Sequence, residues 1–114
     1  DFTGKIVTDG KIPSNKLNAG FAKQLESFGP WGKDFEEPKF HGKFHIHDQR
    51  VVGNHHLKME VQPVEGHKII DAIAFNQDKF IARDSVGFVY RLCLNEFRGN
   101  TKEQLIVEKI YGEI

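Results

Sequence analysis

The sequence predicts a small, mostly β domain in which a five-stranded barrel follows a short strand and an α-helix. Three observations support this fold class. The chain has 114 residues, which is the length of one domain. Its first apolar stripe has the period of a helix. After residue 39 apolar and polar residues alternate, as is typical of half-buried strands.

Residues 1–38 are predicted to form the part that precedes the barrel and packs on it. A short strand and turn are expected at residues 4–13, because this segment contains the turn signal Thr-Asp-Gly. A helix is expected to begin after Asn18, a favourable N-cap residue, and to end where Gly29 and Pro30 follow it. Three apolar residues at helical spacing would face the core from this helix: Phe21, Leu25 and Phe28.

Residues 39–114 are predicted to form the barrel. In the first strand, residues 40–48, apolar side chains alternate with histidine and lysine. A Gly-Asn turn at residues 53 and 54 leads into a second strand whose inner face has Leu57, Met59 and Val61. The other strands are expected at residues 68–76, 86–97 and 104–110, with turns at 63–66 and 98–102 and a short helical turn at 77–84.

The predicted strands form a three-stranded meander, then a break, then a two-stranded hairpin. This is the strand order of an OB-fold Greek-key barrel. Such barrels bind single-stranded nucleic acids or sugars across the outer face of strands two and three and the adjoining loops. The periodicity alone predicts only a small antiparallel β domain with an N-terminal helix. Other five-stranded barrel folds are therefore alternatives at this point.

Composition limits the classes of function. Sixteen basic residues balance sixteen acidic ones, so any electrostatic function must come from local clustering. The single cysteine, Cys93, excludes an internal disulfide framework and agrees with a reducing, cytoplasmic setting. No apolar run reaches the length of a membrane span, so we expect no membrane partner. Because the chain begins with Asp1 and not with Met, we expect a fragment of a longer protein.

Four segments in order resemble the C-terminal region of RecJ-type single-strand-specific exonucleases: LESFGPWG at 25–32, DAIAF at 71–75, LNEFRG at 94–99 and QLIVEKI at 104–110. The resemblance extends from about residue 9 to residue 110. It implies an OB-fold domain that follows a catalytic core of the DHH phosphoesterase class. That core degrades single-stranded DNA from 5′ to 3′ with Mn²⁺ or Mg²⁺. Its Asp and His metal motifs do not occur here, so the fragment is expected to be non-catalytic and without a cofactor of its own.

The loop after the predicted helix departs from the family pattern. The family continues after the second glycine as Gly-Asn-Pro-Glu-Pro, whereas only Glu37 and Pro38 match here, so functions particular to that run are not carried over. We expect Trp31 to bury its ring between helix and barrel. The alternative is a base-stacking platform, and Phe35 suits either role.

Basic residues gather on the outward face of the first two predicted strands. Between residues 39 and 58 there are four lysines and arginines and one acid, Asp48, a local net charge of plus three. A cationic groove follows a phosphate backbone without reading its sequence, although a solvated mixed-charge face is the alternative. In the last hairpin, an aromatic ring could stack on a base and two cations could reach phosphates. The predicted nucleic-acid-binding residues are Lys43, His45, Arg50, His56, Lys58, Phe97, Arg98 and Lys102.

Histidine is a common metal ligand, and four histidines lie on the first two strands: His41, His45, His47 and His56. No metal site is predicted, because alternating residues of one strand do not converge and no cysteine or carboxylate completes a set. Cys93 is expected to be an inert buried residue, and no nucleophilic arrangement is present. The alternative functions are an OB-fold protein-interaction module of a DNA repair protein and a small metal-dependent enzyme.

The resemblance also implies the partners. Single-stranded DNA and the catalytic core of the same chain are the expected ones, and a single-strand-binding protein is a candidate.

Overall fold

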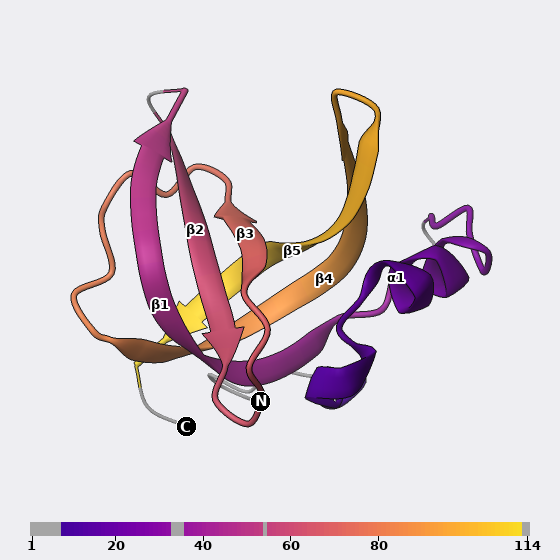
Figure 1. The fold of residues 1–114 in the computed structure, drawn as a ribbon, viewed down its shortest axis with the longest axis horizontal. Coiled ribbons are helices and arrows are strands. Elements are labelled where there is room, and N and C mark those ends of the chain that lie inside the picture. The colour runs from indigo at the N-terminus through magenta and orange to yellow at the C-terminus, as the bar shows by residue number, and fades with distance from the viewer. Residues whose placement is uncertain (1–7, 33–35, 54, 113–114) are drawn as a thin grey trace.

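The computed structural model describes residues 8–32, 36–53 and 55–112 of the chain. A 3₁₀ helix at Ser14–Lys16 and helix α1 at Ala19–Glu26 precede five strands: β1 Phe40–Val52, β2 His56–Pro63, β3 Ile70–Ala74, β4 Ser85–Phe97 and β5 Asn100–Tyr111. The strands close into a barrel in the order β1-β2-β3-β5-β4 (Figure 1). Among the strand pairs that the structure describes, β3–β5 alone is parallel. The predicted OB-fold class is confirmed.

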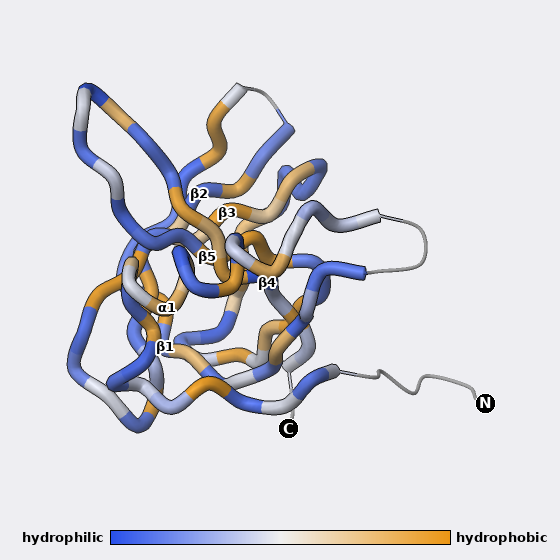
Figure 2. The backbone as a smooth tube through the Cα atoms, turned by 90° about the vertical axis from the view of Figure 1, so that its right-hand side faces the viewer, coloured by the Kyte–Doolittle hydropathy of each residue, from blue (hydrophilic) through white to orange (hydrophobic). Residues whose placement is uncertain are grey.

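Bulky apolar side chains fill the barrel, and aromatic rings form the centre of this core. The ring of Phe44 stacks on Phe88 at 5.2 Å between centroids and meets Tyr90 edge-on at 5.5 Å. Such pairs contribute about 0.5–1.5 kcal/mol each beyond the area that they bury. Burial raises the pKa of the Tyr90 phenol far above its ordinary value of 10.0. The hydropathy of the chain agrees, since hydrophobic stretches converge inside the barrel and hydrophilic ones occupy much of the hairpin ends (Figure 2).

The predicted inner face of β2 is confirmed, because Leu57, Met59 and Val61 are all buried. In β1 the alternation holds only as far as Ile46. There Ile46 pairs with Val61, and Asp48 pairs with the preceding residue of β2, which leaves His47 as the extra residue of a β-bulge.

The bulge decides which side chains of β1 face water. Strict alternation from Phe44 and Ile46 would turn Asp48 and Arg50 toward the core. One extra residue reverses this phase, so both lie on the outer face. Direct partners across two strands share a face, and Arg50 is the direct partner of Lys58.

The segment between β3 and β4 contains no helix, so the helical turn predicted for residues 77–84 is wrong. It runs beside β1, held by the side-chain amide of Gln49. Gln49 Nε2 donates to the Ile81 carbonyl and the Ile81 N–H donates to Gln49 Oε1, both at 2.8 Å. Nearby, the Ile46 N–H donates to the Asp84 carbonyl at 2.8 Å. Because β1 satisfies these backbone groups, the segment stays extended.

Helix α1 begins as predicted, with the Asn18 side chain accepting a hydrogen bond from the Phe21 N–H at 2.8 Å. Phe21 and Leu25 pack against the core, and α1 contacts β4 and β5. The helix ends at Glu26, earlier than its apolar period predicts. Phe28 therefore leaves the core-facing side and is 61% exposed, so the prediction that it packs inside is wrong.

The strand predicted at residues 4–13 is not present in its described part, residues 8–13. This segment is tied to the start of β1 instead. The Asp9 N–H donates to the Lys39 carbonyl at 2.7 Å, and the His41 N–H donates to the Gly10 carbonyl at 3.0 Å. Residues 4–7 and Asn54 of the predicted turn lie outside the described residues. None of the helices that the structure describes combines the length and apolar character needed to cross a bilayer.

Replacing Gln49 by Met should lower the free energy of unfolding by about 1–3 kcal/mol, because two backbone groups of Ile81 lose their partner. Urea denaturation measures the loss, and hydrogen exchange of the Ile81 N–H should accelerate. Gln49→Glu is the matched control, since it keeps the acceptor for this N–H and loses only the donor. If Gln49→Met changed neither measurement, the amide would not hold this segment.

Candidate nucleic-acid interface

Two long hairpins rise from the same side of the barrel. The β1–β2 hairpin turns after Val52 and the β4–β5 hairpin at Arg98 and Gly99, with the end of β3 between them (Figure 1). In an OB fold this side is formed by the outer face of strands two and three and by the loops that flank it. The fold therefore marks this face as the candidate binding surface.

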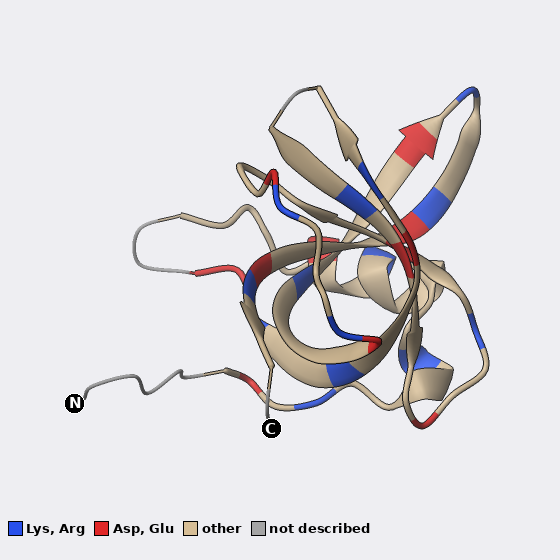
Figure 3. Cartoon of the chain, turned by 90° about the vertical axis from the view of Figure 1, so that its left-hand side faces the viewer, with Lys and Arg blue, Asp and Glu red and all other residues tan. Residues whose placement is uncertain are grey.

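Charged side chains on the outer face of the first three strands form two rows that cross the strands. The cationic row consists of Arg50 on β1 and Lys58 on β2, which are direct partners and are followed by Ile73 on β3. The acidic row consists of Asp48, Glu60 and Asp71, which are likewise partners across β1, β2 and β3. Basic and acidic positions thus follow one another along the same strands (Figure 3).

An aromatic pair lies beside the cationic row, toward the β1–β2 turn. Phe75 directly follows β3, is 52% exposed, and meets the His56 ring edge-on at 5.1 Å between centroids. His56 Nδ1 accepts a hydrogen bond from the Asn76 N–H at 3.1 Å, which fixes the ring and places the proton of the neutral imidazole on Nε2. Sequence reasoning missed Phe75. The signal that could have indicated Phe75 is its position directly before Asn76, because asparagine favours turns and an aromatic residue beside a turn is often exposed.

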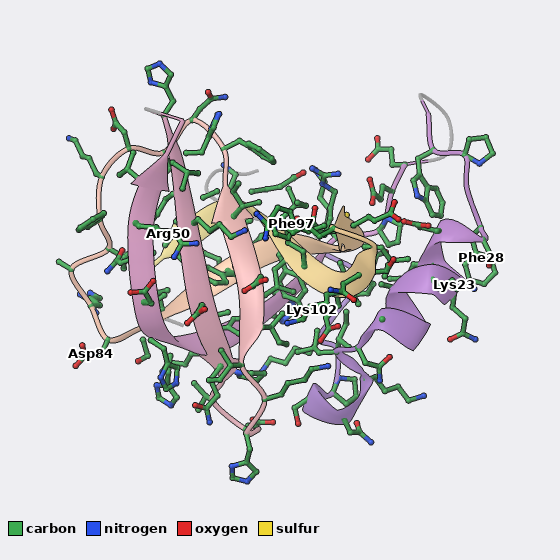
Figure 4. The ribbon with its side chains drawn as sticks, turned by 45° about the horizontal axis from the view of Figure 1, so that its top comes forward. Lys23, Phe28, Arg50, Asp84, Phe97 and Lys102 are labelled. Carbon is green, nitrogen blue, oxygen red and sulfur yellow. The ribbon has the colours of Figure 1, made fainter. Side chains whose placement is uncertain are left out.

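A second aromatic–cation pair forms the tip of the β4–β5 hairpin. Phe97 is 64% exposed, and the Arg98 guanidinium lies 5.0 Å from the centre of its ring. The turn has two central residues at positive φ, Arg98 at 53° and Gly99 at 81°, as in a type I′ turn. The turn predicted at residues 98–102 is thus shorter, and Lys102 belongs to β5, paired with Asn95. Phe97 and Lys102 lie across β3 from Arg50 (Figure 4).

The structure does not bring all eight predicted residues together. Arg50, His56 and Lys58 form one group. Phe97, Arg98 and Lys102 form a second on the other hairpin. Lys43 and His45 lie near the opposite end of β1, where they pair with β4 residues Gly87 and Ser85. Lys43 lines a pocket there with Lys11 and Ser14.

The histidines on the outer face of β1 form separate contacts. His41 Nδ1 lies 2.6 Å from Thr8 Oγ1, and His47 Nε2 lies 2.7 Å from Gln62 Oε1. Within residues 8–32, 36–53 and 55–112, no three His, Cys, Asp or Glu side chains are grouped so that they could hold a metal ion.

An ion-pair cluster joins the segment before β1 to β4 and β5. Arg91 binds Glu37 at 3.0 Å and Glu108 at 2.8 Å, and Lys39 binds Glu108 at 2.9 Å. Trp31 is half-buried beside this cluster and lines a shallow pocket with several of its members, and the role of its ring stays a prediction. Phe35 lies outside the described residues.

Cys93 lies on β4 next to the ion-pair cluster. Its thiol donates a hydrogen bond to Glu37 Oε2 at 3.7 Å. Burial, with the negative charge of Glu37, raises the pKa of this thiol to about 11. The thiolate is therefore scarce at neutral pH, which supports the predicted inert role. The side chain is half-buried, however, and not buried as predicted.

Comparison with known proteins identifies the family. The protein-family model described as the RecJ OB domain matches residues 8–109 of the sequence. The chain belongs to the RecJ OB domain family. The predicted resemblance is thereby confirmed, over nearly the same range of residues that the sequence motifs indicated.

Relatives of this RecJ OB domain are much longer proteins. The single-stranded-DNA-specific exonuclease RecJ of Haemophilus influenzae is 43% identical over 113 residues, which are 94% of this chain and 20% of that protein. The Escherichia coli protein of the same name is 41% identical over 112 residues, 95% of this chain and 19% of that protein. The chain thus spans about a fifth of the length of these relatives.

A solved structure agrees in fold with this RecJ OB domain. RecJ from Thermus thermophilus in complex with Mg²⁺ superposes with a TM-score of 0.71 at 18% identity, over 92% of this chain and 16% of that one. At this level of identity the likeness concerns the fold alone.

Glu108→Gln should lower the free energy of unfolding at pH 7 by about 0.5–1 kcal/mol, since the carboxylate is partly exposed. Burial acts to raise the pKa of Glu108, but Lys39 and Arg91 outweigh it and hold the pKa below its ordinary value of 4.5. A carboxyl group whose pKa is lowered by folding stabilises the fold above its unfolded pKa, and this contribution is lost as the pH falls through the folded pKa.

Urea denaturation between pH 7 and pH 3 measures this effect. The Glu108→Gln variant should lose less stability than the parent as the pH falls below 4.5. Glu65→Gln, at an exposed turn, is the control and should keep the pH dependence of the parent. Identical pH profiles for Glu108→Gln and the parent would contradict the assignment.

Proposed function

We propose that this RecJ OB domain binds single-stranded DNA between its two hairpins, as the non-catalytic part of a single-strand-specific exonuclease that acts from 5′ to 3′. The names of its relatives support the class of nucleic acid. The observation that carries the proposal is the combination on one face of a cationic row and two exposed aromatic groups. Single-strand-binding surfaces use this combination, in which cations follow the backbone and rings stack on bases.

The proposed contacts follow the geometry of the face. Arg50 and Lys58 bind phosphates, because their side chains are adjacent on the outer face and Lys58 has no ion pair among the described residues. Phe75 with His56 offers one stacking surface, and Phe97 with Arg98 offers the other. Lys102 lies lower on the β4–β5 hairpin and adds a further cation for the backbone of the DNA strand beyond the base that stacks on Phe97.

The conformation of Arg98 supports a role in binding. A residue with a Cβ atom at positive φ costs about 1–2 kcal/mol, and the first position of a type I′ turn favours Asn, Asp or Gly. Arg98 at 53° bears this cost at the tip of an exposed hairpin. Its guanidinium is thereby held over the Phe97 ring, where a planar cation can stack on a base or bind a phosphate.

Catalysis belongs, in this proposal, to a core of the parent protein outside this chain. Two solved structures with the same fold are RecJ in complex with Mg²⁺ and with Mn²⁺, and either ion would act in that core. Residues of this domain would hold the strand and leave the metal-dependent step to the core.

Lys58→Ala and Phe97→Ala should weaken single-stranded DNA binding in different ways. Without the Lys58 contact to a phosphate, binding of the DNA releases fewer counterions. Lys58→Ala should therefore reduce the slope of log affinity against log salt by about 0.7. Stacking of a base on a ring releases no counterions. Phe97→Ala should therefore weaken the free energy of DNA binding by about 1–3 kcal/mol and leave the slope unchanged.

Titrations of a fluorescent single strand at several salt concentrations measure both quantities. Lys23→Ala on α1 removes one charge far from the face (Figure 4) and should change the slope little. The proposal fails if both test variants fold and bind as the parent does.

Arg98→Asn should make the domain more stable and a weaker binder at once. Asn fits positive φ better, so the free energy of unfolding should rise by about 1 kcal/mol. The DNA affinity should fall together with the salt slope, because a cation is lost. Arg98→Lys keeps the charge without the planar group, so it should keep the slope and gain no stability. Binding by Arg98→Asn at full strength would show that this cation does not contact DNA.

A further inference from the structure

We propose that the acidic row, Asp48, Glu60 and Asp71, makes this face select one strand of DNA over a duplex. The inference rests on the proposed function, since it concerns what the same face rejects. It assigns a specificity role to three residues that carry the same charge as the ligand.

The three carboxylates lie side by side across three strands. Asp48 is the direct partner of Glu60, and Glu60 is the direct partner of Asp71. Side chains of direct partners leave the same face with Cβ atoms about 4.5–5.5 Å apart. Asp48 and Glu60 are exposed and Asp71 is half-buried, so the row meets whatever approaches this face.

The charge of the row is mostly uncompensated. Arg50 Nη1 lies 3.8 Å from Asp48 Oδ2, and within the described residues no ion pair reaches Glu60 or Asp71. Like charges directly opposite one another destabilise a sheet. A surface that keeps such an arrangement beside a binding site is typical of specificity achieved by repulsion of the wrong ligand.

A single strand can avoid the row. The cationic row lies two residues farther along each strand, or about 7 Å away. Phosphates on Arg50 and Lys58 would leave the bases free to turn toward His56 and Phe75, away from the carboxylates.

A duplex cannot avoid the row so easily. Its second backbone lies across a groove about 6 or 12 Å wide. On one side that backbone would lie over the carboxylates, within reach of a charge interaction that decays over about 8 Å at physiological salt. On the other side the two hairpins rise from the barrel (Figure 1), and we expect them to obstruct that backbone.

The test is a variant that neutralises the row without changing its shape, Asp48→Asn/Glu60→Gln/Asp71→Asn. A labelled single strand and a duplex of equal length are titrated at several salt concentrations. Duplex affinity should rise by about tenfold or more and single-strand affinity by about threefold or less, because the repulsion acts mainly on the second backbone. The melting temperature should also rise, since three like charges are removed.

The control variant Glu26→Gln/Glu65→Gln/Asp84→Asn makes the same change in net charge at exposed positions outside the row. It should raise both affinities alike and leave their ratio as in the parent. A ratio that the acidic-row variant leaves unchanged, or changes no more than the control does, overturns this inference alone. Single-strand binding that Lys58→Ala and Phe97→Ala leave unaltered overturns both the inference and the proposed function.

Discussion

The bulge at His47 is the constraint on which the candidate site depends. It shifts the inward–outward alternation of β1 side chains by one residue in the middle of the strand, so that even-numbered side chains face the core before it and solvent after it. Before it, Phe44 and Ile46 enter the core, and after it, Asp48 and Arg50 turn to solvent. Both charged rows begin with residues that this shift places outside. Without the bulge two charges would enter an aromatic core, where neither could be solvated.

The same shift links the barrel to the segment that follows β3. Gln49, turned toward the inner side after the bulge, uses its amide as a substitute for a neighbouring strand. One local irregularity thus exposes the charged rows and anchors the segment that precedes β4. On the far side of the barrel, ion pairs of Arg91 and Lys39 perform the corresponding task for the segment before β1.

Much of the fold could be predicted because its signals are local. The alternation of Leu57, Met59 and Val61 and the N-cap at Asn18 act within a few residues. The bulge and the path of residues 77–84 depend on pairing with other segments, which periodicity does not record. Phe28 is exposed because α1 ends at Glu26, before its apolar period does. In the site, Phe97 and Arg98 were visible beside a turn signal, whereas the acidic row exists only through the register of three strands.

The closed barrel has a kinetic consequence. The β1–β2 pairing joins neighbouring residues, but β3 meets β5 through Asp71 and Gln104, and β1 meets β4 through Phe40 and Tyr90. These closing pairs bring together segments that lie far apart in the chain, so their loop entropy must be lost before they stabilise anything. Folding dominated by such non-local contacts takes about milliseconds to seconds, and the two hairpins can form well before the barrel closes. The binding face spans both hairpins and would therefore be assembled only in that last step.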